Sequence, residues 1–391
     1  MYFPTAASVG AADALLTLFI VLLAAKVGDE IFKRIGQPAL VGEILAGVVV
    51  GPSLLGLVEP DATLELFGEL GVVFLLFWVG LETRLSQLRE VGRTALGVGI
   101  LGVIVPFSAG FALGLALDEG FATSAFLGAA LVATSVGITS AVLIDLGVLE
   151  TRASRTILAA AIVDDILALL LLSVAVGFAA EGSVDVAAIL VPLGLAGAFV
   201  VFVALGGVQL VQRQPDLLRR PSFSESPLLP AVIVLLGLAA FAAQIGLAAI
   251  IGAFLAGMVI AESNDRDDVE EEVAPLYAFF PPFFFAFIGT EVDLGAFASG
   301  STLLLLVGVT VLAMATKFGA GRLAARRLGR REAAFVGVGM VPRGEVGIIV
   351  AGIGAMTGVV DEELFAVIVG MSILTTLAVP PLLKRLAPGN C

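Results

Sequence analysis

The chain has 391 residues, of which 59% are hydrophobic and only 14% are charged, and its mean hydropathy is +1.10. A typical soluble domain carries about 25% charged residues, so this composition excludes a soluble globular protein and indicates a membrane protein. The formal net charge of −13 argues against nucleic acid as a partner.

Apolar runs of about 17–25 residues can cross the roughly 30 Å of hydrocarbon in a bilayer as single helices. The sequence predicts thirteen such spans, and in chain order they are Ala12–Phe32, Leu40–Leu57, Leu64–Gly80, Thr94–Leu117, Thr123–Leu146, Thr156–Ala179, Val186–Val211, Leu228–Gln244, Leu247–Glu262, Val273–Thr290, Thr302–Leu323, Ala333–Met356 and Glu363–Leu383. Only Gln244 to Gly246 separates the eighth from the ninth, so twelve spans are the alternative. The first run lacks a basic segment and an evident cleavage site, which predicts a retained span rather than a signal peptide.

The charges between the spans alternate in sign along the chain. One set of connections carries nearly all the basic residues: Lys33, Arg34, Arg84, Arg89, Arg93, Arg152, Arg155, Arg213, Arg219, Arg220, Arg266, Arg322, Arg326, Arg327, Arg330, Arg331, Lys384 and Arg385. The other set carries only acids: Glu59, Asp61, Asp118, Glu119, Glu181, Asp185, Asp361, Glu362 and Glu363. The positive-inside rule places the basic connections in the cytoplasm. We therefore expect a multi-pass protein of the cytoplasmic membrane, with its N-terminus outside and its C-terminus inside.

Thirteen spans divide into six, a linking helix and six, and the two halves then have opposite topology. The fifth span of each half is interrupted near its middle by a polar, Gly-containing segment, Ala133 to Gly137 in one half and Val341 to Glu345 in the other. Paired interruptions of this kind mark the substrate site in secondary transporters. The sequence thus predicts an all-α polytopic membrane protein with two inverted-topology repeats and two broken helices that cross.

Two adjacent acids, Asp164 and Asp165, lie inside an otherwise unbroken apolar helix. A charge at this depth costs at least about 2.5–3.5 kcal/mol, which favours a functional role over a surface pair at a helix end. Burial and mutual repulsion both favour protonation, which suits a site that alternates between a proton and a cation. Because the chain has no histidine, proton handling near neutral pH falls to carboxylates or lysines. The single cysteine, Cys391, excludes an intrachain disulfide.

Other polar residues lie within or next to the spans. Lys317 lies late in the eleventh span, where it either pairs with a carboxylate such as Asp164 or snorkels to the surface. Thr134 and Ser135 offer hydroxyl oxygens to a hard cation such as Na⁺, although such residues also bond to their own helix backbone.

Three charged residues are candidates for a structural or gating role: Arg343, Glu345 and Glu82. Arg343 could pair with Glu345, with Glu82 or with another acid, and we expect this interaction to be architectural. The acidic segment from Asp265 to Glu272 is interpreted as a solvated loop on the cytoplasmic side.

Several motifs follow one another along nearly the whole chain: Gly42 to Gly47, Gly51-Pro52, Gly80 to Glu82, Ala133 to Thr139, Asp164-Asp165, Phe283 to Phe285 with Gly289, Lys317, and Val341 to Gly347. Together they resemble the cation/proton antiporter superfamily, in particular its NapA-type bacterial and archaeal Na⁺/H⁺ exchangers. The resemblance implies a secondary active transporter that exchanges Na⁺ (or Li⁺) for H⁺, without a cofactor. It also implies that Asp165 binds Na⁺ and H⁺ and that Asp164, a second cation ligand, pairs with Lys317. The Asp-Asp pair with a lysine resembles the electrogenic branch.

The same resemblance implies a homodimer in which one transmembrane transporter domain, 1–391, has two parts. Residues 1–93 and 186–298 would form the dimerisation scaffold with the linking helix. Residues 94–180 and 299–386 would form an ion-transporting core that moves like an elevator.

Three other functions are considered. A K⁺/H⁺ exchanger or K⁺ efflux transporter of the same superfamily differs in its ion and its regulation. The chain ends soon after the last span, so it lacks the nucleotide-binding regulatory domain of the glutathione-gated K⁺ efflux relatives, although a truncated chain would look the same. An intramembrane aspartyl protease takes its two acids from separate helices and carries a Gly-x-Gly-Asp motif, which this sequence lacks. A passive channel fits interrupted helices and a buried lysine less well than alternating access does.

Overall fold

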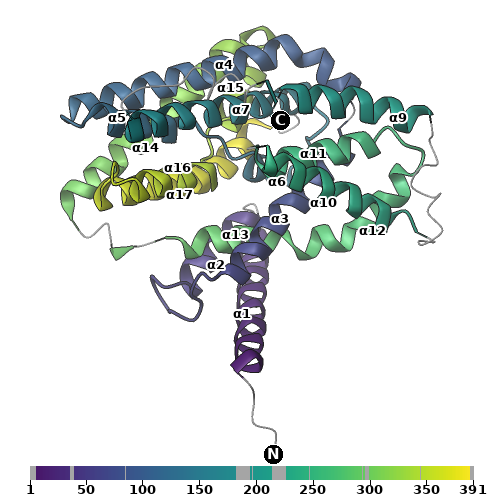
Figure 1. Cartoon of the computed structure of the whole chain (residues 1–391), viewed down its shortest axis with the longest axis horizontal. Coiled ribbons are helices and arrows are strands. Elements are labelled where there is room, and N and C mark those ends of the chain that lie inside the picture. The colour runs from purple at the N-terminus through teal and green to yellow at the C-terminus, as the bar shows by residue number, and fades with distance from the viewer. Residues whose placement is uncertain are drawn as a thin grey trace, which may run out of the picture.

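The computed structural model describes residues 6–35, 39–83, 85–181, 194–195, 197–213, 226–245, 247–292, 294–295, 299–343 and 345–387. Within these ranges every regular element is helical, and the elements in chain order are α1 (Ala6–Arg34), α2 (Ala39–Val50), α3 (Ala62–Leu81), α4 (Leu85–Ala116), α5 (Phe121–Val132), α6 (Val136–Asp145), α7 (Arg152–Glu181), the π-helical η1 (Phe202–Gly207), α9 (Val208–Arg213), α10 (Leu228–Gln244), α11 (Ala249–Ile260), α12 (Arg266–Phe279), α13 (Pro281–Thr290), α14 (Gly300–Ala324), the 3₁₀ helix η4 (Ala325–Leu328), α15 (Arg330–Gly339), α16 (Glu345–Met356) and α17 (Glu362–Leu386) (Figure 1). The predicted all-α class is confirmed.

Most predicted spans coincide with a helix or with a pair of helices. In the described ranges, six helical stretches are long and apolar enough to cross a membrane: Ala62–Leu81, Val91–Ala116, Phe121–Asp145, Arg266–Thr290, Gly300–Leu328 and Glu362–Leu386. The shorter apolar helices α10 and α11 coincide with further predicted spans, whereas α2 ends at Val50, before the predicted end at Leu57. The first half of the predicted linking span, from Val186, lies outside the described residues, so the count of thirteen stays a prediction.

One prediction around α12 and α13 is wrong, and another gains detail. The predicted span from Val273 to Thr290 lies within Arg266–Thr290, a stretch long and apolar enough to cross a membrane. This stretch is two consecutive helices, because Pro281 and Pro282 at the first positions of α13 cannot donate the backbone hydrogen bonds that would continue α12. The acidic segment from Asp265 to Glu272 is not a loop but the beginning of α12. Acids in a first helical turn interact favourably with the helix dipole, so this segment remains helical although its mean hydropathy is low.

The two interrupted helices lie against each other. The first break separates α5 from α6, and the second separates α15 from α16, at the two places that the sequence predicts. The Ser135 backbone N–H donates to the Pro342 carbonyl oxygen at 2.8 Å, and the Thr139 hydroxyl donates to the Gly339 carbonyl oxygen at 2.8 Å. Each break therefore satisfies polar backbone groups of the other, which lipid could not do.

The helices pack in two groups (Figure 1). The α4 bundle comprises α4, α5, α7, α14, α15, α16 and α17, and the α3 bundle comprises α1, α2, α3, α10, α11, α12 and α13. Helix α6 contacts both groups, through α7 and α17 on one side and through α2 and α3 on the other. The free end of α1 projects away from the other helices in this view. The boundary between the two bundles is thus lined by α6 and by the helices that face it.

Small residues allow the helices of the α3 bundle to approach closely. A Cβ atom on Gly257 of α11 would lie 2.2 Å from the Phe77 carbonyl oxygen of α3, and one on Gly80 would lie 2.3 Å from the Phe254 carbonyl oxygen. Side chains at these two positions would force the backbones apart. Close backbone approach through small residues is a common way for helices to associate in membranes.

Gly257→Ala is expected to lower the thermal unfolding midpoint in detergent, because overpacking a close contact costs about 1–3 kcal/mol. The matched control is Gly237→Ala on α10, where a new Cβ would meet nothing within 4 Å. Alanine favours a helix over glycine, so the control should be neutral or slightly stabilising. Equal midpoints for the two variants would contradict the close packing of α3 against α11.

Candidate functional site

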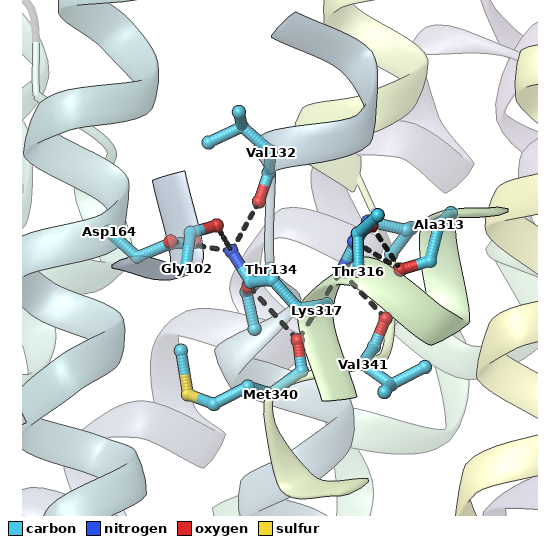
Figure 2. A network of polar contacts seen from close by, with 10 residues as sticks. Gly102, Val132, Thr134, Asp164, Ala313, Thr316, Lys317, Met340 and Val341 are labelled. Atoms are coloured by element: carbon cyan, nitrogen blue, oxygen red, sulfur yellow. Dashed lines mark hydrogen bonds and ion pairs between the residues drawn. The ribbon is translucent and has the colours of Figure 1, made fainter. Parts of the chain in front are cut away.

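The centre of the α4 bundle holds a fully buried ion pair. The Lys317 Nζ lies 2.6 Å from the Asp164 Oδ1, and both side chains are inaccessible to solvent. The same ammonium donates to the carbonyl oxygens of Gly102 and Val132, each at 2.7 Å (Figure 2). An ammonium has three donors, so all three are used. Lys317 therefore points into the bundle and does not snorkel to the surface.

Lys317 and its three partners come from four different helices. Gly102 lies on α4, Val132 is the last residue of α5, Asp164 lies on α7, and Lys317 lies on α14. The break after α5 leaves the Val132 carbonyl without a partner in its own helix, as at any helix C-terminus. The dipole of α5 also places negative partial charge at this end, which favours a cation. The broken helix thus helps to hold the charge of Lys317 inside the membrane.

Arg343 occupies the corresponding place at the second break. Its guanidinium is fully buried and donates to the carbonyl oxygens of Met340 at 3.3 Å, Val341 at 2.8 Å and Ala313 at 3.3 Å. Met340 and Val341 follow the C-terminus of α15, so this cation also faces the negative end of a broken helix. Each break is therefore matched by one buried cation.

The ion pair between Arg343 and Glu82 that the sequence suggested does not form. Glu82 follows α3 and accepts a hydrogen bond from the Trp78 Nε1 at 2.7 Å, while Arg343 is occupied by backbone carbonyls. Burial raises the pKa of the Glu82 carboxyl above its usual range. The Glu345 side chain, the other suggested partner, lies outside the described residues, so that pairing stays a prediction. The contacts of Arg343 that are described are architectural.

Asp165 faces a different set of helices from Asp164. Its side chain is 3% exposed and lines a small pocket of about 10 Å³ together with Leu76 of α3, Val136 of α6 and Phe254 of α11. Consecutive residues on a helix point about 100° apart, so α7 can present one acid to Lys317 and the other to this pocket. The pocket lies on the boundary between the two bundles, because α7 and α3 both line it.

Thr134 and Ser135 lie in the break between α5 and α6. The Thr134 hydroxyl donates to the Met340 carbonyl oxygen at 3.3 Å, and Ser135 is the N-cap residue of α6. Both side chains are buried, and Thr134 also forms a hydrogen bond with Asp164 of α7. Within the described ranges, no group of three or more His, Cys, Asp or Glu side chains could hold a metal ion. A cation here would need hydroxyl and carbonyl oxygens in addition to carboxylates.

Two backbone groups of the site, the carbonyls of Gly102 and Val132, were not identified from the sequence. Gly102 carried a signal, since it is a glycine inside a predicted span, where glycine permits a close approach. A Cβ atom at this position would lie 3.5 Å from the Lys317 Nζ and 3.6 Å from the Asp164 Oδ1. Val132 carried no signal in its own residue type, because any residue at the end of α5 presents the same carbonyl.

A large acidic cavity is lined by residues from both bundles, next to α13 of the α3 bundle and α17 of the α4 bundle. Its volume is about 1030 Å³, and four acids line it: Glu291 after α13, and Asp361, Glu362 and Glu363 at the beginning of α17. Burial, and secondarily the charge of Glu65, raise the pKa of the Glu291 carboxyl above its usual range. Thr302 of α14 donates to Glu363 at 2.7 Å. Negative charge is therefore concentrated in this cavity, where α13 ends and α17 begins.

Comparisons with known proteins identify the family that this chain matches. A family model described as "Sodium/hydrogen exchanger, transmembrane" matches residues 15–385. The Na(+)/H(+)-K(+) antiporter GerN of Bacillus cereus is 36% identical over 93% of this chain and 94% of its own length. The high-affinity Na(+)/H(+) antiporter NhaS3 of a Synechocystis strain is 34% identical over 97% of this chain and 90% of its own length.

A solved structure shares the fold. The sodium proton antiporter MjNhaP1 from Methanocaldococcus jannaschii superposes with a TM-score of 0.70 over 96% of this chain and 98% of its own, at 19% sequence identity. The resemblance of the sequence to cation/proton antiporters is thereby confirmed at the level of both family and fold.

Proposed function

Because the chain belongs to the sodium/hydrogen exchanger family of cation/proton antiporters, we propose that it exchanges Na⁺ (or Li⁺) for H⁺ across the cytoplasmic membrane. The chain is a multi-pass transporter and not an enzyme. Its substrates are a cation and protons, and no cofactor is needed to exchange them. The choice of Na⁺ is supported by the two similar antiporters, whose names both include this ion.

In this proposal Asp165 is the group that carries the cation in one direction and the proton in the other. The observation that supports this role is the position of Asp165 on the boundary between the two bundles. Alternating access requires a site that meets one aqueous side and then the other, and a bundle boundary can open on either side. Thr134 and Ser135 at the neighbouring break would add hydroxyl oxygens to the cation site, and Asp164 a second carboxylate.

The Asp164–Lys317 pair would supply a second proton. When a cation binds between the two carboxylates, it replaces the Lys317 ammonium as the charge partner of Asp164. The ammonium can then release a proton. When the cation leaves, Lys317 takes a proton and the ion pair closes again at its 2.6 Å separation. Two protons would then move for each Na⁺, so the exchange is electrogenic.

The two bundles suggest how the site moves. We assign the α3 bundle to a scaffold that also forms a homodimer and the α4 bundle to a mobile core. The scaffold corresponds to residues 1–93 and 186–298 and the core to residues 94–180 and 299–386, except that α4 begins at Leu85 and is assigned to the core as a whole. The mobile core would carry Asp164, Asp165 and Lys317 as one unit past the scaffold. The acidic cavity would attract cations on the outer side, since charged clefts raise the local concentration of counter-ions. With the acidic connections outside and the basic connections in the cytoplasm, the N-terminus lies outside and the C-terminus lies in the cytoplasm.

K⁺/H⁺ exchange is the second candidate function. The name of GerN includes both Na⁺ and K⁺, and K⁺ prefers the same oxygen ligands in a larger site. The pocket beside Asp165 measures about 10 Å³, which is close to the space that one water molecule needs. This small volume supports Na⁺ or Li⁺ as the first candidate, and the flux measurement below distinguishes it from K⁺.

Flux into proteoliposomes tests the proposed function. Vesicles that contain the purified protein and a pH-sensitive dye receive Na⁺, Li⁺ or K⁺ in separate additions. We expect Na⁺ and Li⁺ to move protons and K⁺ to produce little response, while a response to K⁺ alone would identify a K⁺/H⁺ exchanger. In the same vesicles, an imposed membrane potential should drive exchange without an ion gradient. Exchange that is indifferent to the potential would show that one proton moves for each cation.

A further inference from the structure

A basic pocket lies at the arginine-rich end of α4 and α14, far along both helices from the acidic cavity. Its volume is about 370 Å³, and its lining includes Arg93 and Leu101 from α4, Leu323 from α14, and Arg326 and Arg327 from η4. Among the residues that the structure describes, no acidic side chain lines it. The pocket therefore combines a concave shape with three positive charges, a combination that fits an anion.

These arginines lack the ion pairs that other basic residues make. In the part of the chain that the structure describes, no salt bridge joins Arg93, Arg326 or Arg327 to an acid, and all three side chains are exposed. By contrast, Arg34 pairs with Glu30 at 2.8 Å and Arg266 pairs with Glu270 at 3.1 Å. Positive charges that gather without partners repel one another, so an external anion would stabilise this end of the helices.

An apolar surface begins directly beside the arginines and continues toward the middle of the helices. Leu96 and Ile100 of α4 are 50% and 38% exposed, and Leu323 of α14 is 57% exposed. In a membrane-spanning chain such residues face lipid tails. A ligand for this place therefore needs an anionic head and an apolar tail, which distinguishes it from free phosphate.

We propose that this pocket binds the phosphate headgroup of an anionic phospholipid, with its acyl chains along Leu96, Ile100 and Leu323. Basic pockets between membrane helices at the cytoplasmic side are suited to such headgroups. Arginine presents a planar fork of donors that matches phosphate oxygens in pairs. The long arginine side chains can reach from the hydrocarbon boundary to the headgroup level.

The bound lipid would act on the two helices that hold Lys317. Leu101, in the pocket, precedes Gly102, whose carbonyl accepts from Lys317. Helices α4 and α14 approach closely beneath the pocket, where a Cβ atom on Gly97 would lie 3.9 Å from the Ala324 Cβ. A lipid that bridges Arg93 to Arg326 and Arg327 would fix this crossing. It would thereby stabilise the buried ion pair from outside.

Native mass spectrometry of the purified protein tests the proposal with added phosphatidylglycerol, phosphatidylcholine or inorganic phosphate. The wild type should retain phosphatidylglycerol, and the variant Arg326→Gln/Arg327→Gln should bind it about 30-fold more weakly, at about 1 kcal/mol for each basic residue near the surface. The matched control Arg152→Gln/Arg330→Gln removes the same charge from exposed arginines outside the pocket and should bind as the wild type does. Arg326→Lys/Arg327→Lys keeps both charges but loses the paired guanidinium donors, so its affinity should lie between those of the glutamine variant and the wild type.

Three outcomes would overturn the proposal. Equal retention of phosphatidylglycerol by the glutamine variant and the wild type would show that the pocket is not the site. An equal loss in the control would show a response to overall charge. Retention of inorganic phosphate or of phosphatidylcholine equal to that of phosphatidylglycerol would show that an anionic lipid is not specifically recognised. None of these measurements depends on transport, so they remain informative whichever ion the protein exchanges.

Discussion

Asp165→Asn is expected to abolish cation-driven proton movement in proteoliposomes, to the level of empty vesicles. Asparagine keeps the shape of the side chain but can neither carry a proton nor balance the charge of a cation. The side chain is 3% exposed, so bulk water cannot replace the lost carboxylate. The measurement is the dye response to Na⁺ and Li⁺ at several pH values, with equal amounts of protein in the membrane.

Asp267→Asn is the matched control for this change. Asp267 lies in the first turn of α12, and its side chain is 90% exposed. The same chemical change at this place should leave exchange intact. Full exchange by Asp165→Asn would remove Asp165 from the mechanism, and a loss of exchange in the control would show that any lost carboxylate impairs the protein.

Lys317→Met is expected to cause the largest loss of stability among changes at the site. The substitution leaves Asp164 buried and without the partner that now lies 2.6 Å away. Removal of one member of a buried ion pair typically costs about 3–5 kcal/mol. The carbonyls of Gly102 and Val132 would also lose their donor. Thermal unfolding in detergent should therefore show a midpoint well below that of the wild type.

The double variant Asp164→Asn/Lys317→Met should recover much of this loss, because it leaves no uncompensated charge. Its exchange activity should remain absent or become electroneutral, since the pair that supplies the second proton is gone. A double-mutant cycle measures the coupling between the two residues. Losses that simply add would show that the contact contributes nothing to stability beyond its separate parts.

Much of the fold could be predicted from the sequence because lipid makes strict demands on it. A span must be apolar for its whole length, so α10 begins and ends at the predicted residues, Leu228 and Gln244. Polar and Gly-containing interruptions at matching places located both breaks, at Ala133 and at Val341. The proline pair that begins α13 was overlooked, because Pro281 and Pro282 lie within an otherwise continuous apolar run.

Residues of the candidate site could be predicted from the sequence only where a charged side chain lies within an apolar run. Asp164, Asp165 and Lys317 were identified because charges in apolar runs need a reason to be there. The partners of Arg343 could not be found in this way, because they are backbone carbonyls of Met340, Val341 and Ala313, which every residue possesses. The three-dimensional crossing of the two breaks decides which carbonyls are free, and residue types do not record that crossing.

Proton release on Na⁺ binding tests most directly whether one carboxylate serves both ions. The purified protein, in weakly buffered detergent solution with a pH indicator, receives Na⁺ at a series of pH values. If Asp165 binds either ion, the wild type releases protons when Na⁺ is added, and its apparent Kd for Na⁺ rises as the pH falls. The rise approaches about tenfold per pH unit for the Asp165 proton alone and is steeper where Lys317 releases a second proton. Asp165→Asn should release none, whereas Asp267→Asn should match the wild type. Proton release by Asp165→Asn equal to that of the wild type would contradict competition at this residue.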